Sequence, residues 1–230
     1  MEKDFSKLEK AIKVKFKDKD LLKQALVHRS YLNEHPGFAL DQNERLEFLG
    51  DAVLELVVTE YLYLHYDNPE GELTNWRASL VNSKMLAKLS TDIGADDFLF
   101  LSKGEQQDKG KARQYILANA FEAIIGAIYL DQGWDKAKLF IEKNVLKELP
   151  EILDKKLYID PKSRFQELSQ EKVGATPVYK VLKEYGPDHE KHFEVGAFLN
   201  NDLIAKGEGS SKQEAQEQAA QNGIEAKKWS

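Results

Sequence analysis

The sequence contains no cysteine, no long uncharged segment and no excess of positive charge. Without Cys, its 230 residues can form neither disulfide bonds nor thiolate zinc sites. No uncharged stretch reaches the roughly 18 residues that a membrane-spanning helix needs. The first residues carry acidic side chains and no apolar run, which does not fit a signal peptide. These absences predict a cytoplasmic protein that has no membrane partner.

The charge of the chain argues against nucleic acid as a partner. The net charge is −6 and the isoelectric point lies near 5.5, whereas nucleic-acid-binding domains are often basic. Residues 160–230 alone carry ten Lys and Arg against twelve Asp and Glu. A polyanionic partner therefore requires a local basic patch or bound metal ions.

One predicted helix carries acidic residues in an apolar setting. The segment from Asn43 to about His65 is apolar on nearly all sides, which is typical of a buried helix. Glu44, Glu47 and Asp51 are spaced by three and four residues, so they lie along one face. Burying such charges without compensation is costly. The pattern therefore indicates a divalent cation.

A second predicted helix, residues 116–130, supplies further oxygen ligands. It is apolar on every side except for Asn119 and Glu122, which are one turn apart. Mg²⁺ prefers carboxylate oxygens and keeps some of its water ligands, so two such helices suit it. A di-iron site requires Glu-x-x-His, and no His follows Glu44, Glu47 or Glu122 at that spacing.

The segments around these two helices are also predicted from their patterns. An apolar stripe predicts one helix over residues 72–89, and a Gly-, Lys- and Gln-rich stretch predicts an exposed loop over 102–113. A helix over 135–149 is expected to end at Pro150, and residues 151–159 read as a charged connector.

The C-terminal part follows a different pattern. Alternating apolar residues predict strands between two amphipathic helices, and Asn200-Asn201 suits a tight hairpin turn because Asn tolerates positive φ. The predicted elements are a helix over 162–172, strands over 177–185, 192–199 and 202–206, and a helix over 212–228. The fold class is therefore multi-domain, with an all-α domain followed by a small α+β domain of α-β-β-β-α order.

Two motifs resemble those of one family. The nine residues Asn43–Asp51 resemble the ribonuclease III signature without interruption, and the C-terminal unit with its Gly207-Glu-Gly-Ser-Ser-Lys212 motif resembles a double-stranded RNA-binding domain. Together the two modules cover nearly the whole chain, in the order found in bacterial ribonuclease III. The resemblance implies a homodimeric endonuclease domain over 1–150, a linker over 151–159 and an RNA-binding domain over 160–230.

The resemblance also implies an activity and its residues. It implies an endoribonuclease that uses Mg²⁺, with Mn²⁺ as a substitute, and cleaves double-stranded RNA to 5′-phosphate and 3′-hydroxyl ends. rRNA precursors and other structured RNAs are the implied substrates. Metal ligands are matched by Glu47, Asp51, Asn119 and Glu122, of which Asp51 and Glu122 are catalytic. Glu44 and Glu70 match acidic residues of the cleft, and Phe48 matches an aromatic residue that enters a socket on the partner subunit.

For the C-terminal unit, the resemblance implies contacts with two minor grooves and a phosphate. Residues that match 2′-hydroxyl readers are Ser163, Gln166, Glu167 and Gln170, and His189 matches the loop that enters the next minor groove. Ser210, Ser211 and Lys212 begin the last helix, where backbone N–H groups and the helix dipole favour a phosphate. Gln213 stands where the family often has a second Lys. Such domains read duplex shape over roughly 16 base pairs.

Asn119 departs from the family pattern, which typically has Asp at this position. Its neutral amide oxygen can still bind Mg²⁺ or hold a metal-bound water, but one negative charge is lost. The first hypothesis is therefore an active endonuclease that needs more metal. The second is a double-stranded RNA-binding protein that no longer cleaves. A structural metal site in an unrelated helical protein is a third, which leaves the C-terminal unit unexplained.

Overall fold

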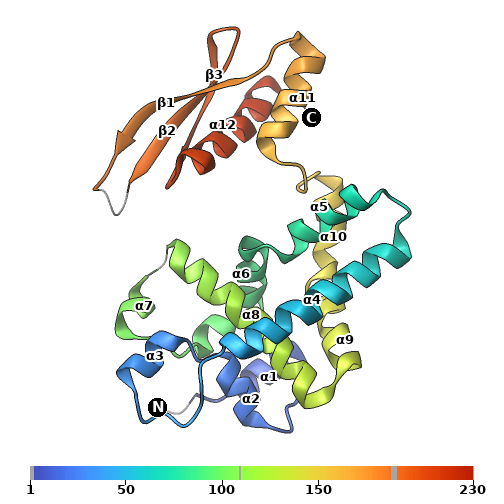
Figure 1. Ribbon diagram of the computed structural model, residues 1–230, viewed down its shortest axis with the longest axis vertical. Coiled ribbons are helices and arrows are strands. Elements are labelled where there is room, and N and C mark those ends of the chain that lie inside the picture. The colour runs from blue at the N-terminus through green and yellow to red at the C-terminus, as the bar shows by residue number, and fades with distance from the viewer. Residues whose placement is uncertain (1–2, 109, 188–190, 230) are drawn as a thin grey trace. The chain divides into compact units, whose positions relative to one another are not determined.

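The chain forms two compact units, Met1–Tyr158 and Ile159–Ser230, each with its own hydrophobic core. The structure is a computed structural model and describes residues 3–108, 110–187 and 191–229 (Figure 1). The first unit is built of helices, and the second combines a three-stranded sheet with two helices. The predicted fold class is therefore confirmed.

The first unit contains ten α-helices and two short 3-10 helices within the described residues. They are α1 (Ser6–Ile12), α2 (Lys19–Ala25), α3 (Arg29–Glu34), α4 (Glu44–His65), α5 (Glu70–Val81), α6 (Ser83–Asp92), η1 (Ala95–Phe98), α7 (Lys103–Gln107), α8 (Lys111–Gln132), α9 (Trp134–Asn144), η2 (Leu146–Glu148) and α10 (Leu149–Asp154). In the part of the chain that the structure describes, no helix is both long enough and apolar enough to cross a membrane.

Helices α4 and α8 form the centre of this unit. Each is 22 residues long, and they pack more extensively on each other than any other pair of elements (Figure 1). Leu54, Val57 and Val58 of α4 are fully buried, as are Phe121 and Ile124 of α8. Since shorter helices surround both, side chains on several sides of each helix are excluded from water. This arrangement confirms the two buried helices that the sequence predicts.

Several of the predicted segments differ from the structure. The predicted helix over 72–89 is two helices, because Asn82 leaves the helical conformation (φ −72°, ψ 157°) and its side chain caps α6. The predicted loop over 102–113 contains α7 and the first turn of α8. The predicted helix over 135–149 ends at Asn144 and is followed by η2 and α10. Residues 151–154 of the predicted connector also belong to a helix, α10. The break at Asn82 arises at a capping residue, which the apolar pattern does not reveal.

The second unit has the predicted α-β-β-β-α order. Its elements are α11 (Pro161–Val173), β1 (Val178–Tyr185), β2 (His192–Leu199), β3 (Asp202–Gly209) and α12 (Lys212–Lys227). The sheet is antiparallel in the order β1-β2-β3, and α12 packs on β2 and β3 while α11 packs on α12. Asn200 and Asn201 both have positive φ (48° and 72°), which confirms the predicted tight turn. Phe165 of α11 is fully buried in the core of this unit.

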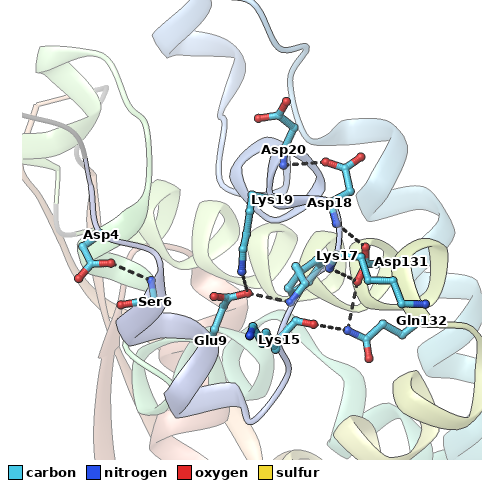
Figure 2. A network of polar contacts seen from close by, with 11 residues as sticks. Asp4, Ser6, Glu9, Lys15, Lys17, Asp18, Lys19, Asp20, Asp131 and Gln132 are labelled. Atoms are coloured by element: carbon cyan, nitrogen blue, oxygen red, sulfur yellow. Dashed lines mark hydrogen bonds and ion pairs between the residues drawn. The ribbon is translucent and has the colours of Figure 1, made fainter.

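A polar network fixes the segment between α1 and α2 (Figure 2). Asp131, near the end of α8, accepts the backbone N–H groups of Lys17 and Asp18 at 2.9 and 2.8 Å. Glu9 of α1 accepts the N–H of Phe16 at 2.7 Å. Burial raises the pKa of Asp131, but the N–H groups of Asp18 and Lys17 outweigh burial and hold it below its ordinary value. The carboxylate form of Asp131 therefore stabilises the fold.

We predict that Asp131→Ala lowers the free energy of unfolding by about 1–2 kcal/mol at neutral pH, because two N–H groups lose a charged acceptor. Since folding lowers the pKa of Asp131, this stabilisation is present above the unfolded-state pKa and is lost as the solution becomes more acidic. Urea unfolding at several pH values measures it. Asp41→Ala, at an exposed loop carboxylate, serves as the control. Equal stability of both variants at neutral pH contradicts the prediction.

Candidate functional site

The central helices cross with their backbones in contact. A β-carbon built on Gly50 of α4 would lie 1.8 Å from the carbonyl oxygen of Glu122, and one built on Gly126 of α8 would lie 2.2 Å from the carbonyl oxygen of Leu46. Real atoms do not approach so closely, so this crossing requires glycine on both helices. The contact places the acidic face of α4 directly beside the polar residues of α8.

The side chain of Glu122 lies in this crossing and is half-buried. Burial raises the pKa of its carboxyl group to about 8, with further contributions from the negative charges of Asp51, Glu47 and Glu55. The contributions from these charges indicate that the carboxylates lie close enough to repel one another. The structure therefore brings Glu47, Asp51 and Glu122 together, although they come from two helices.

Glu47 and Asn119 connect the two helices directly. Burial and the charge of Glu44 raise the pKa of Glu47, with a smaller contribution from Asp51. The side chain of Asn119 acts in the opposite direction, because its amide donates a hydrogen bond to the Glu47 carboxylate. The four predicted metal ligands thus form one polar group, in which Asn119 supplies the one side chain that is not an acid.

The negative charge of this group has no cationic partner in the described part of the chain. No Lys or Arg there forms an ion pair with Glu47, Asp51 or Glu122, whereas Glu55, one turn further along α4, pairs with Arg77 at 3.0 Å. No three His, Asp or Glu side chains among the described residues are gathered tightly enough to enclose a metal ion. The ligand set fits a hard cation that retains water ligands and accepts an amide oxygen, as Mg²⁺ does.

Of the other predicted residues of the first unit, Glu44 borders this group, whereas Glu70 and Phe48 lie outside it. Glu44 is exposed in the first turn of α4 and accepts a hydrogen bond from Gln42 at 2.9 Å. Glu70 begins α5 and lines a cavity of about 730 Å³ between α5 and the C-terminal half of α4. Phe48 points away from the core, with 81% of its surface exposed. None of the four predicted metal ligands lines the cavity.

In the second unit, the predicted contacts lie on exposed surface. Ser163, Gln166, Glu167 and Gln170 are exposed on α11, while Phe165 of the same helix is buried. The predicted contact His189 lies outside the described residues.

The N-terminus of α12 holds the remaining predicted contacts. The hydroxyl of Ser211 accepts the N–H of Glu214 at 3.2 Å and so caps the helix. Ser210 donates its N–H and its hydroxyl to the Glu214 carboxylate at 3.0 and 2.6 Å. Lys212 pairs with Glu184 of β1.

Gly50 and Gly126 were not among the predicted site residues, although each stands in a buried helix otherwise rich in side chains, where glycine often marks a close approach. Glu55, which continues the acidic spacing four residues after Asp51, was not predicted either. Its partner Arg77 also donates a hydrogen bond from Nη1 to the hydroxyl of Thr59 at 2.9 Å. Arg77 therefore fixes α5 to α4 beside the acidic group.

Comparisons with known proteins agree on both units. A family model described as ribonuclease-III-like matches residues 18–149, and the double-stranded RNA binding motif matches residues 161–226. The chain is 43% identical over 224 residues to ribonuclease 3 of Campylobacter jejuni, with 97% of each chain covered. It is 41% identical to ribonuclease 3 of Enterococcus faecalis, with 92% of each covered.

Among solved structures, the chain is similar to the nuclease domain of ribonuclease III from Campylobacter jejuni, with 45% identity and a TM-score of 0.55. The match covers 61% of this chain and 98% of that domain. That structure is described as flexible in a region involved in dimer formation. A second structure of the same domain, at 2.2 Å resolution, also has 45% identity and a TM-score of 0.55.

We predict that Gly50→Ala destabilises the protein by about 1–3 kcal/mol or more, because the added methyl group forces α4 and α8 apart. Gly71→Ala is the matched control, since a β-carbon at Gly71 meets no atom within 4 Å and alanine favours the helix. Thermal and urea unfolding of both variants measure the effect. A Gly50→Ala variant as stable as the Gly71→Ala variant would show that the helices do not touch here.

A second prediction concerns pH in protein kept free of divalent cations. The pKa of Glu122 is 4.5 as its ordinary value and about 8 in the folded protein. Between these two pH values the folded state binds more protons than the unfolded state, so the free energy of unfolding falls as pH rises. Glu122→Gln removes the contribution of Glu122 to this dependence, and we expect the variant to be more stable than the parent above about pH 8. Near pH 4.5 the two should converge. Urea unfolding of both proteins with EDTA, near pH 4.5 and above pH 8, provides the comparison. If the difference between their free energies of unfolding is the same at both pH values, the raised pKa of Glu122 is wrong.

Proposed function

This chain belongs to the ribonuclease III family and is an endoribonuclease of double-stranded RNA; we propose that Glu47, Asp51, Asn119 and Glu122 hold the Mg²⁺ with which it cleaves. The observation that carries this proposal is the acidic group at the crossing of α4 and α8, which has no cationic partner among the described residues. Mn²⁺, which also prefers oxygen ligands, is proposed as a substitute.

When bound, Mg²⁺ polarises the scissile phosphate and lowers the pKa of a water molecule that attacks it. Two side chains, Glu122 and Asn119, would act as ligands of this cation. Glu122 would hold the cation as a carboxylate, so its carboxyl group would have to give up its proton to solvent before binding. Asn119 holds the Glu47 carboxylate by its amide N–H, which leaves its own carbonyl oxygen available to the metal or to a metal-bound water.

The non-cleaving alternative rests on Asn119 alone. Replacing a carboxylate by an amide removes one negative charge from the ligand set, which weakens attraction for a divalent cation. However, three carboxylates remain in the group, and an amide oxygen is still a hard ligand. We therefore propose an active enzyme with a raised metal requirement rather than an inactive RNA-binding protein.

The test is incubation of the full chain with a long RNA duplex over a range of Mg²⁺ concentrations. We expect cleavage products with 5′-phosphate and 3′-hydroxyl ends, and none with EDTA. Glu122→Gln should lower the rate by two or more orders of magnitude, while Asn119→Asp should reach half of its maximal rate at a lower Mg²⁺ concentration. If the parent cleaves no duplex at any concentration of Mg²⁺ or Mn²⁺, the proposed activity is wrong.

We further propose that the first unit forms a homodimer through α4. Phe48, Leu56 and Tyr63 are 81%, 57% and 77% exposed, and their spacing places Phe48 and Leu56 on one face of the helix. Exposed large apolar side chains on one face mark an interaction surface. In a two-fold dimer each surface contacts its own copy, so Phe48 of each subunit would enter the partner's cavity between α4 and α5.

Phe48→Ala tests this dimer. Loss of a central aromatic contact from both halves of a two-fold interface should weaken dimerisation by at least tenfold. Leu139→Ala removes an apolar side chain that is 57% exposed on α9, outside the α4 surface, and serves as the control. Sedimentation velocity over a range of protein concentrations gives the dissociation constants. The interface is misplaced if Leu139→Ala weakens the dimer as much as Phe48→Ala does.

For the second unit, we propose that the exposed face of α11 and the N-terminus of α12 contact duplex RNA, through Ser163, Gln166, Glu167, Gln170, Ser210, Ser211 and Lys212. All of these side chains except the partly buried Ser211 are exposed, which supports this role. We also propose the division into an endonuclease domain (1–150), a linker (151–159) and an RNA-binding domain (160–230). The two structural units support two domains, but they divide at Tyr158 and Ile159, so residues 151–158 pack with the first unit. Processing of rRNA precursors in the cytoplasm, and a role for His189, stay predictions.

A further inference from the structure

Lys212, proposed above to contact an RNA phosphate, already has an anionic partner within the domain. Its Nζ lies 3.1 Å from Oε1 of Glu184, at the end of β1. The other carboxylate oxygen of Glu184 lies 3.8 Å from Nζ of Lys191. One carboxylate therefore approaches two ammonium groups, one at the start of β2 and one at the start of α12.

The sheet holds Glu184 in this position. Glu184 and Phe193 are directly opposite each other in the pairing of β1 with β2, so their side chains share one face of the sheet. Nζ of Lys212 lies 5.5 Å from the centre of the Phe193 ring, on the same side. The ammonium of Lys212 is thus placed by a ring and a carboxylate together.

This ion pair remains accessible to solvent and to competing anions. The Lys212 and Glu184 side chains are 57% and 39% exposed. Exposed pairs of this kind contribute little stability, because water and salt screen them. An RNA phosphate can therefore displace the carboxylate at modest cost. The displaced carboxylate would then stand beside the phosphate and repel it.

We propose that Glu184 sets the affinity of this protein for duplex RNA by occupying Lys212 in place of a phosphate. This inference rests on the proposed phosphate contact of Lys212. In the free protein Glu184 neutralises Lys212, and in the complex the carboxylate has exchanged for an RNA phosphate. The domain carries no net positive charge. The pairing of Glu184 with Lys212 therefore weakens the binding of polyanions at the N-terminus of α12.

The test is the affinity of the full chain for a duplex RNA, measured by fluorescence anisotropy in buffer without divalent cations, where cleavage is suppressed. Glu184→Gln keeps the size of the side chain and removes its charge. We expect it to tighten binding roughly two- to fivefold, the factor that an exposed ion pair represents. The slope of log affinity against log salt concentration should become steeper by up to about one unit. In the variant, Lys212 contacts the phosphate without first giving up its pairing with Glu184.

Two further variants separate the possible failures. Glu225→Gln removes one negative charge from the far end of α12 and controls for net charge. Lys212→Ala should weaken binding, and adding Glu184→Gln to it should change affinity no more than Glu225→Gln does.

The inference is overturned if Lys212→Ala weakens binding while Glu184→Gln equals the Glu225→Gln control. It is also overturned if Glu184→Gln weakens binding, because Glu184 then positions Lys212 for the phosphate instead of competing with it. If Lys212→Ala binds as the parent does, the proposed phosphate contact fails, and the inference fails with it.

Discussion

The backbone contact between α4 and α8 is the interaction on which the rest of the structure depends. With glycine at positions 50 and 126, the two longest helices approach until a carbonyl oxygen of one occupies the space of a side chain on the other. The apolar residues around this contact form the core of the first unit. The same approach brings polar residues of both helices together at one side of the crossing. Packing and the candidate active site are therefore consequences of a single contact.

The electrostatics of the site follow from this geometry. Glu47 and Glu122 are half-buried, and Asp51 beside them is exposed. Burial of Glu122, together with the negative charges near it, raises its pKa to about 8. A folded protein tolerates such repulsion where a bound cation offsets it, and this is the reason for the proposed ligand set. Arg77 shows the contrast, since it compensates Glu55 directly and leaves the neighbouring group unpaired.

The sequence alone predicts those features whose residue pattern lies within a single helix, strand or turn. The two buried helices, the acidic spacing along α4 and the Asn200-Asn201 turn are of this kind, because apolar periodicity and turn propensity are local. Features that depend on contact between distant segments were missed. The closeness of Gly50 to Glu122 and the pairing of Lys212 with Glu184 arise only when separate elements meet. The break at Asn82 is different, because it is a local cap that apolar periodicity does not reveal. The polarity of Asn119 was visible in the sequence, but its hydrogen bond to Glu47 was not.

The central claim is that the carboxylates at this crossing bind a divalent cation and that Glu122 must lose a proton when they do so. Isothermal titration calorimetry of the metal-free full chain with Mg²⁺, at neutral pH and in buffers of different ionisation enthalpy, measures both properties at once. The account predicts binding that releases close to one proton per site, and loss of that release in Glu122→Gln. Binding without proton release, or release that persists in Glu122→Gln, would contradict it.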